Sequence, residues 1–196
     1  MVSELAHRVR RAFRPAFLQR WRRDDAGVTS IEFAIVALPF LMLLFGLMSV
    51  CVYYFTNFTL ENAAWQAARA IRTGQMQQSQ GGYAGAVTSD DRKKLFKKAL
   101  CAYAPMLADC ESKVVVIVQS NTSFGGISKP SCATNGVLTN DALAAFDPGS
   151  ASAVVLVTVC YPWSAGGTLP FFKMGNLQGG ALLMQATVAL RTEPYT

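Results

Sequence analysis

A single glutamate, Glu32, stands at the start of a long apolar run, in the stretch from Gly27 to Phe33 that reads GVTSIEF. An unpaired acidic side chain costs about 2.5–3.5 kcal/mol at mid-bilayer on insertion scales, and less near the interface. Hydration of Glu32 among lipid headgroups is therefore the simple interpretation. The residue immediately before Val28 is a glycine, and a cluster of arginines precedes that glycine.

Four of the five cysteines follow the apolar run, and the fifth, Cys51, lies inside it, where it is most simply an apolar filler. An even number of cysteines in an oxidising compartment favours two disulfides over free thiols. Of the three possible pairings we prefer Cys101–Cys110, which would clip a turn, and Cys132–Cys160, which would tie a long loop to a strand. The absence of a C-x-x-C pair disfavours zinc binding and thioredoxin-like redox chemistry.

Residues suited to catalysis are scarce. The only histidine is His7, so the body of the protein cannot hold a Ser-His-Asp or Cys-His set or a histidine metal site. The acid pairs Asp90-Asp91 and Asp109/Glu111 are better explained by a helix cap and a solvated turn. Calcium at such acids is conceivable, but no loop has the dense oxygen ligands of an EF-hand. We therefore expect no enzyme, no metal and no cofactor.

The segment from Ile31 to Phe55 is predicted to be a single membrane span. It has 25 residues, and Glu32 is its only charge. At about 1.5 Å per residue its length exceeds the ~30 Å hydrocarbon core. A signal peptide has an apolar core of about 7–15 residues and a small-x-small cleavage site after it, which does not fit here. Pro39 predicts a bend near Ile35, because its ring clashes with the carbonyl four residues back.

The basic charge belongs mainly to the leader, residues 1–27. This leader holds seven Lys/Arg and three Asp/Glu, a net charge of +4, whereas residues 28–196 hold eleven and nine, a net of +2. Arginines before the span predict a cytoplasmic N-terminus and an external C-terminal region. This distribution argues for an orientation signal and against nucleic-acid binding.

The helix is predicted to continue past the membrane, from about Thr29 to Thr73, with Gly74 ending it. Residues 57–73 lack Gly and Pro and are rich in alanine, a strong helix former. Residues 28–73 thus form a transmembrane and spine helix. Its predicted packing residues are Phe33, Pro39, Ala63, Ala64, Ala67 and Ala68.

Residues 74–196 are predicted to form a periplasmic α+β domain. Ser89 or Asp90 is predicted to cap the start of a second helix, and the four lysines of this helix are interpreted as a solvated face. β-Branched content predicts a strand at 113–119, and a second strand is predicted at 153–161. Alternation predicts a third strand at 181–191, although its length also permits a helix, and a short helix is predicted at 141–146. The predicted fold class is α+β, with an antiparallel sheet of three to four strands packed on the outer half of the long helix.

These motifs resemble the TadE-like family of the tight-adherence (Flp, type IVc) pilus. The residues before and after Gly27 resemble a type IV prepilin processing site, in which a membrane aspartyl protease cuts after the glycine. The family's pattern has a Gly…Val-Glu-Phe-Ala start, a Leu-Pro inside the span and a Glu-Asn-Ala-Ala…Ala-Ala-Arg end. It corresponds here to about residues 26–72, a quarter of the chain, and Glu193-Pro194 resembles the family's ending. Ile31 stands where Val is common.

The resemblance implies a minor pseudopilin that is cut between Gly27 and Val28. Glu32 would then be the fifth residue of the mature chain, and its carboxylate would pair with the N-terminus of a neighbouring subunit. The implied partners are the prepilin peptidase, other pilins and pseudopilins, the inner-membrane assembly platform and membrane lipids. The implied location is the bacterial inner membrane, with possible incorporation into the pilus.

Two other classes of function stay open on the sequence. One is an uncleaved single-span anchor that presents a ligand- or partner-binding domain in the periplasm. The other is an extracytoplasmic enzyme, which the scarcity of catalytic residues disfavours.

Overall fold

The computed structural model describes residues 27–164 and 175–195. The arginine-rich segment 1–26 and the aromatic pair Phe171 and Phe172 lie outside these residues. The chain divides into two compact units, residues 1–45 and 46–196, and the boundary falls inside one continuous helix, α3. The proposed division at residues 27 and 73 is a separate matter and stays a prediction.

Helix α3 spans Val28–Arg72, 45 residues in all, and continues without interruption through Pro39. The predicted limits are correct to within one residue. Gly74 follows with a φ of +75°, and its N–H donates to the Ile71 carbonyl at 3.2 Å. A left-handed residue ends a helix in this way at low cost when it is glycine. A Cβ at this position would overlap the Tyr195 ring, so the fold requires glycine here.

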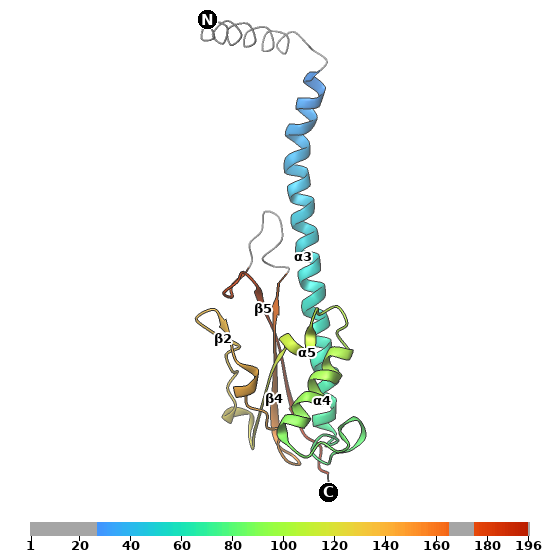
Figure 1. The fold of residues 1–196 in the computed structure, drawn as a ribbon, viewed down its shortest axis with the longest axis vertical. Coiled ribbons are helices and arrows are strands. Elements are labelled where there is room, and N and C mark those ends of the chain that lie inside the picture. The colour runs from blue at the N-terminus through green and yellow to red at the C-terminus, as the bar shows by residue number, and fades with distance from the viewer. Residues whose placement is uncertain (1–26, 165–174, 196) are drawn as a thin grey trace, which may run out of the picture. The chain divides into compact units, whose positions relative to one another are not determined.

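The chain beyond α3 has the predicted α+β class (Figure 1). Strands β1 (Val115–Asn121), β4 (Val154–Trp163) and β5 (Leu182–Arg191) form an antiparallel sheet in the order β1-β4-β5. β1 begins two residues later than the sequence suggested, because Cys110–Lys113 forms the short helix α5. The predicted 141–146 helix is a single 3₁₀ turn, η4 (Asp141–Leu143).

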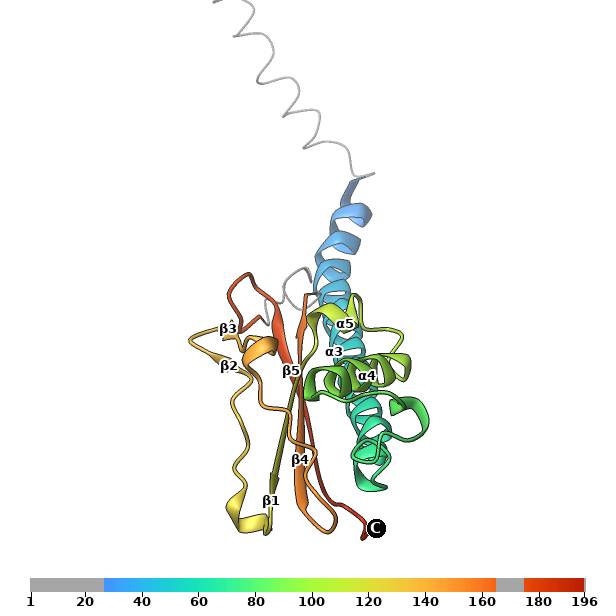
Figure 2. The ribbon, with the colours of Figure 1, turned by 60° about the horizontal axis from the view of Figure 1, so that its bottom comes forward.

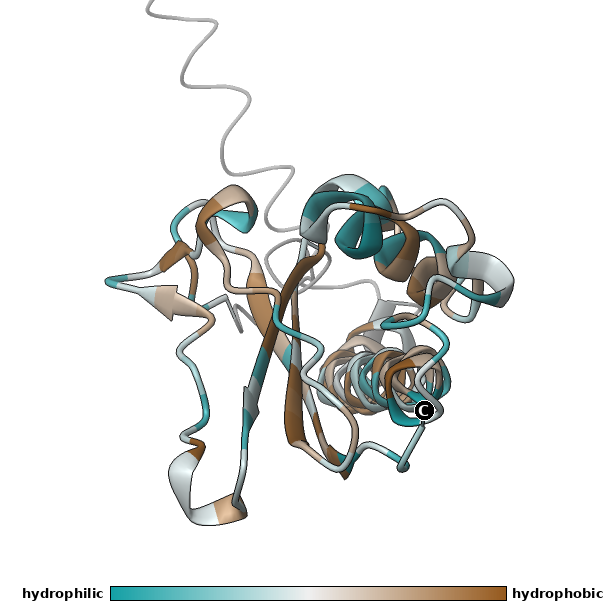
Figure 3. Cartoon of the chain, turned by 90° about the horizontal axis from the view of Figure 1, so that it is seen from below, coloured by the Kyte–Doolittle hydropathy of each residue, from teal (hydrophilic) through white to brown (hydrophobic). Residues whose placement is uncertain are grey.

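The three-stranded sheet is covered on both faces by different elements. The outer half of α3 and helix α4 (Ser89–Ala102) lie on one face, and the two-residue strands β2 (Ala133–Thr134) and β3 (Val137–Leu138) lie beyond the other (Figure 2). Seen from below, the hydrophobic strands stand between these two groups (Figure 3). The remaining elements are the 3₁₀ turns η2 (Gly81–Tyr83) and η3 (Phe124–Gly126).

Helix α4 begins one residue earlier than its predicted cap would allow, because the cap is Thr88 and neither Ser89 nor Asp90. The Asp91 N–H donates to Thr88 Oγ1 at 3.1 Å, and the Thr88 N–H donates to an Asp91 carboxylate oxygen at 3.3 Å. This capping box satisfies two backbone donors that would otherwise lack partners at the start of the helix.

Candidate assembly interface on the long helix

The carboxylate of Glu32 lies on the first turns of α3 and is exposed. Across residues 27–164 and 175–195, no ion pair involves this side chain. Gly27, just before the helix, is also exposed, and a Cβ added there would meet nothing within 4 Å. The structure therefore leaves both Gly27 and Glu32 accessible to another molecule.

The first half of α3 carries many large apolar side chains that are exposed. Phe33 is 74% exposed and Phe40 61%, and Pro39 is exposed as well. This helix is long and apolar enough to cross a membrane, and only 6% of its most apolar window is buried. A core helix of a soluble protein would be mostly buried, so this half is built for an apolar environment outside its own chain.

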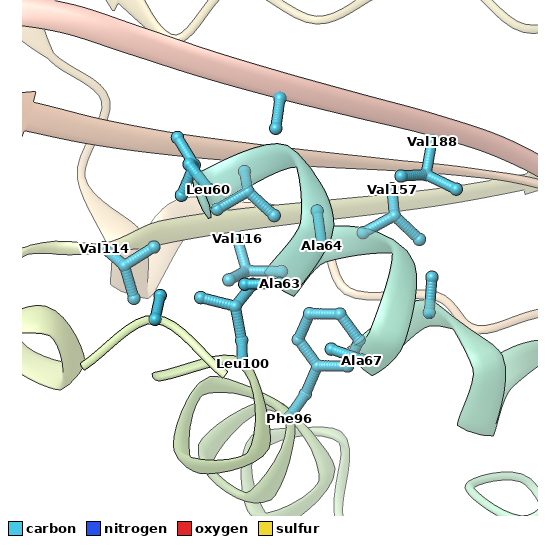
Figure 4. Packing of buried hydrophobic residues seen from close by; sticks show 14 of the residues in the cluster. Leu60, Ala63, Ala64, Ala67, Phe96, Leu100, Val114, Val116, Val157 and Val188 are labelled. Carbon is cyan, nitrogen blue, oxygen red and sulfur yellow. The ribbon is translucent and has the colours of Figure 1, made fainter. Parts of the chain in front are cut away.

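The second half of α3 buries its small residues under the sheet and α4. Ala63, Ala64, Ala67 and Ala68 are all at most 2% exposed. Figure 4 shows Phe96 and Leu100 of α4 beside this turn, with Val116, Val157 and Val188 of the sheet around it. Alanine lets the helix backbone approach both neighbours closely, and the long valine and leucine side chains fill the space. These four predicted packing residues therefore contact elements of their own chain.

A different set of α3 residues remains exposed in this second half. Phe58 is 69% exposed and Trp65 58%, and the charged residues Glu61, Arg69 and Arg72 lie on the same side of the helix at spacings of three and four. From the sequence, the alanines of this half were singled out as packing residues, and Phe58 and Trp65 were not. Their size was the available signal, since a tryptophan does not fit where a helix backbone meets a sheet.

Both predicted disulfides are present, in the preferred pairing. Cys101 and Cys110 join the last turn of α4 to α5, with a Cα–Cα distance of 5.7 Å. Cys132 and Cys160 join the segment before β2 to the middle of β4, at 5.8 Å. Both bridges hold elements that cover the second half of α3 or the far face of its sheet. Cys51, the remaining cysteine, is free and exposed on α3.

The lysines of α4 are not all solvated, and this corrects the sequence interpretation. Lys93 is buried, and its ammonium contacts Asp141 at 3.2 Å, while Lys97 contacts the other oxygen of Asp141 at 3.0 Å. The Val116 N–H on β1 also donates to Asp141, at 3.3 Å. Burial alone would raise the pKa of the Asp141 carboxyl, but these hydrogen bonds hold its pKa below the usual value. The cluster thus fastens α4 to the edge of the sheet.

The acid pairs have structural surroundings. Asp91 belongs to the capping box, and the hydrogen bonds from Thr88 lower its pKa. Asp109 precedes α5 and forms an ion pair with Lys113 at 2.9 Å. No group of three or more His, Cys, Asp or Glu side chains that could hold a metal ion occurs within the described part of the chain.

The described chain thus combines one apolar helix that is long enough to cross a membrane with a small disulfide-bonded α+β domain. Residues 27–69 match the family model described as TadE-like protein. The match confirms the resemblance found in the sequence and covers the segment from Gly27 to Arg69. It links the chain to the pilus-associated proteins of the Tad system, whose TadE-like members have structural rather than enzymatic roles. No curated protein and no solved structure matches this chain.

Proposed function

We propose that this chain is a minor pseudopilin of a tight-adherence pilus, processed by a prepilin peptidase and active in pilus assembly through protein–protein contacts. One observation carries the proposal: the exposed apolar half of α3 has a single acid, Glu32, near its start, inside the segment that matches the family. A simple anchor needs neither that carboxylate nor a spine that continues into the outer domain.

The proposed cleavage lies between Gly27 and Val28. Two glycines flank α3, and they differ in whether the fold requires glycine at that position. Gly74 has a positive φ and no room for a Cβ, whereas Gly27 has open space around it. Glycine at position 27 is thus unexplained by folding, and recognition by a protease active site supplies a reason for it.

Glu32 would act after cleavage as a docking group. Cutting after Gly27 gives Val28 a free ammonium group, which is as costly in lipid as an unpaired carboxylate. When the ammonium of one subunit meets Glu32 of another, each charge removes the other's penalty. Pairing would then occur on assembly, while the exposed apolar side chains pack against neighbouring helices or lipid.

The proposed setting follows from charge and composition. The arginines before Gly27 would stay in the cytoplasm, α3 would cross the inner membrane, and the disulfide-bonded domain would lie in the oxidising periplasm. The partners would be the prepilin peptidase, other pilins and pseudopilins and the assembly platform.

Processing is tested by N-terminal sequencing of the full chain after co-expression with the cognate prepilin peptidase. The proposal expects a mature chain that begins at Val28, and it expects Gly27→Leu to block the cut. Gly82→Leu is the matched control, because Gly82 also has open space around it, and it should be processed normally. A chain that keeps Met1 in the presence of active peptidase would favour the uncleaved anchor.

Docking is tested by comparing Glu32→Ala with Glu111→Ala. Both acids are exposed, but Glu111 lies on α5, outside the apolar half of α3. Glu32→Ala should insert and be cut normally but strongly reduce the number of pili seen by electron microscopy. Normal piliation with Glu32→Ala, or equal loss with both variants, would contradict the docking role.

A further inference from the structure

The outer edge of β5 carries a run of backbone groups that nothing in the described chain occupies. Leu183 lies opposite Pro162, which has no N–H, so Leu183 belongs to a pair whose backbone groups point away from β4. In agreement, the Leu183 N–H donates outward to the Asn176 side chain at 2.8 Å. Two residues past β5, the Glu193 N–H also points away from β4 and donates to the Arg72 carbonyl at 2.8 Å.

Four alternate residues lie between these two tied ends. They are Gln185, Thr187, Ala189 and Arg191, and strand alternation directs the N–H and C=O of each away from β4. Within residues 27–164 and 175–195, no backbone group bonds to them on that side. The edge is therefore open along the length of a short strand and fixed at both ends.

The opposite edge of the sheet is closed by its own chain. The Val118 N–H donates to the Ala145 carbonyl at 2.8 Å, and the Asp147 N–H donates to the Val118 carbonyl at 2.9 Å. The Val116 N–H is taken by Asp141. The segment between β1 and β4 thus serves as a cover for β1, and no comparable segment covers β5 among the described residues.

β5 also lacks the usual defences of an exposed edge. Natural edge strands are protected by proline, by charged side chains and especially lysine, by a bulge, by shortness, or by a helix or loop that covers them. β5 is 10 residues long, contains neither Pro nor Lys, has its one charge at its last residue, Arg191, and pairs with β4 in unbroken register from Leu182 to Arg191. A long, regular and unguarded edge is a template for an added strand.

A group of exposed α3 residues lies beside the open edge. It consists of Glu61, Trp65, Arg69 and Arg72, and we call it the Trp65 shelf. A cavity of about 220 Å³ on one side of Trp65 is lined by Glu61 and by Ala186, Thr187 and Val188 of β5. A second cavity of about 170 Å³, on the other side, is lined by Arg69, Arg72 and Leu190, among others. An incoming strand would therefore place alternate side chains against an exposed indole ring and between charges of opposite sign.

The charges along the shelf select the occupant. Arg69 and Arg72 lie at one end, and Glu61 lies at the other. Arg72 already pairs with Glu193 at 3.3 Å, whereas no ion pair of Arg69 is present in the described chain. A strand that fits has an acidic side chain beside Arg69 and an apolar one over Trp65.

We propose that the β5 edge and the Trp65 shelf bind an extended segment of a neighbouring protein, with an acidic residue at its Arg69 end, as a fourth strand of the sheet. The backbone groups of Gln185 to Arg191 supply affinity, and the shelf supplies selectivity. This binding requires neither cleavage at Gly27 nor the Glu32 carboxylate. It can therefore be tested independently of the pseudopilin role.

The test uses the full chain in lipid nanodiscs and two synthetic peptides, Asp-Thr-Val-Thr-Val-Thr and Lys-Thr-Val-Thr-Val-Thr, each with blocked ends, in which alternation puts the charged residue and the valines on the same face. The acidic peptide should slow amide hydrogen exchange at Thr187 and Ala189 at least tenfold and leave Ala186, which already bonds to β4, unchanged. It should bind at least tenfold more tightly than the lysine peptide.

Two variants separate the edge from the shelf. Thr187→Pro removes one outward N–H without touching the β4 ladder, and proline is tolerated on edge strands; it should weaken the acidic peptide about tenfold, whereas Thr187→Val should not. Trp65→Ala should weaken it by a similar factor while exchange at Ala186 shows that the sheet is intact. Equal binding of the two peptides, or unchanged exchange at Thr187 with saturating peptide, would overturn the proposal. So would protection that rises with protein concentration alone, because it would make a second copy the occupant.

Discussion

The first half of α3 has exposed large apolar side chains on every side, whereas the second half buries small side chains against the three-stranded sheet and α4. Phe33 and Ala67 are 34 residues apart on the same continuous helix, yet one is 74% exposed and the other 2%. The small side chains of the second half pack against apolar residues of their own chain. The large apolar side chains of the first half are exposed, so we expect lipid or other proteins to cover them.

This difference shows that the size and distribution of apolar side chains on a helix match the surface that covers it. Large residues on all sides suit a fluid surrounding such as lipid, which adapts to any side chain. Small residues in one stripe suit a rigid neighbour, because close-packed protein surfaces do not adapt. Damage to the covering elements should therefore affect the second half and leave the first unchanged.

The largest expected effect comes from removing a disulfide. Each bridge ties down part of the cover of the second half, and the chain-entropy model makes a longer closed loop worth more. The sequence separations are 28 for Cys132–Cys160 and 9 for Cys101–Cys110. Changing both partners to Ala should cost about 3.6 and about 2.6 kcal/mol of unfolding free energy, respectively.

Urea unfolding of the full chain in detergent micelles, followed by tryptophan fluorescence, measures these losses. Cys51→Ala is the matched control, since Cys51 is free and exposed on α3 and takes part in neither bridge. It should change the unfolding free energy of the outer domain by less than about 0.5 kcal/mol. A comparable loss for Cys51→Ala would show that the losses do not come from the bridges.

A smaller effect is expected from enlarging a buried alanine. Ala67→Leu adds three carbon atoms where the helix meets the sheet, and overpacking of this kind typically costs about 1–3 kcal/mol. Ala34→Leu makes the same change on the exposed half of the same helix and should be close to neutral. Urea unfolding of both variants checks the contrast, and equal stability would mean that the alanine stripe does not set the close approach.

Most of this contrast was readable from the sequence. The helix limits, the membrane-competent run and the alanine stripe follow from hydrophobic periodicity, from Gly74 and from helix propensity, which are all local properties. The first main strand followed from its β-branched content and the last from its alternation, with a helix left open there by its length. The cysteine pairs had few alternatives, and the preferred pairing is the one present in the structure.

What sequence reasoning missed depends on contacts between distant segments. The sequence suggested that Lys93 belongs to a solvated lysine face, but Lys93 is buried and forms an ion pair with Asp141, 48 residues later. The open edge of β5 was equally invisible, because an edge is defined by strand order and by which segment covers the opposite side. Neither property has a local signal, and no alternation or capping pattern reports it.

The Lys93–Asp141 contact gives the third prediction. Asp141→Asn should cost about 1–2 kcal/mol of unfolding free energy, because it leaves the buried Lys93 charge poorly paired; the figure is modest because a third of the Asp141 side chain is exposed to screening solvent. The unfolding midpoint in urea measures the loss. Lys98→Gln, on the exposed side of the same helix, is the control and should be near neutral.

The same carboxylate predicts a pH dependence. The pKa of Asp141 is lower in the folded chain than its ordinary value near 4, so its contribution is complete above about pH 5 and is lost as pH falls through the folded pKa. The stability difference between the parent chain and Asp141→Asn should therefore shrink below pH 4. A difference that stays constant down to pH 2 would show that the carboxylate charge does not fasten α4 to the sheet.

The smallest effect is expected at the start of α4, which covers the second half of α3 through Phe96 and Leu100. Thr88→Ala removes the oxygen that accepts the Asp91 N–H, and loss of an exposed cap costs about 0.5–1 kcal/mol. Thr88→Ser keeps that oxygen and should be nearly neutral. Amide exchange should become faster at Asp91 and Arg92 in Thr88→Ala and stay unchanged in α3 before residue 46, because the cap stabilises the cover and not the membrane half. Faster exchange in that first half would break the comparison, since it would mean that the cap of α4 also stabilises the first part of the helix.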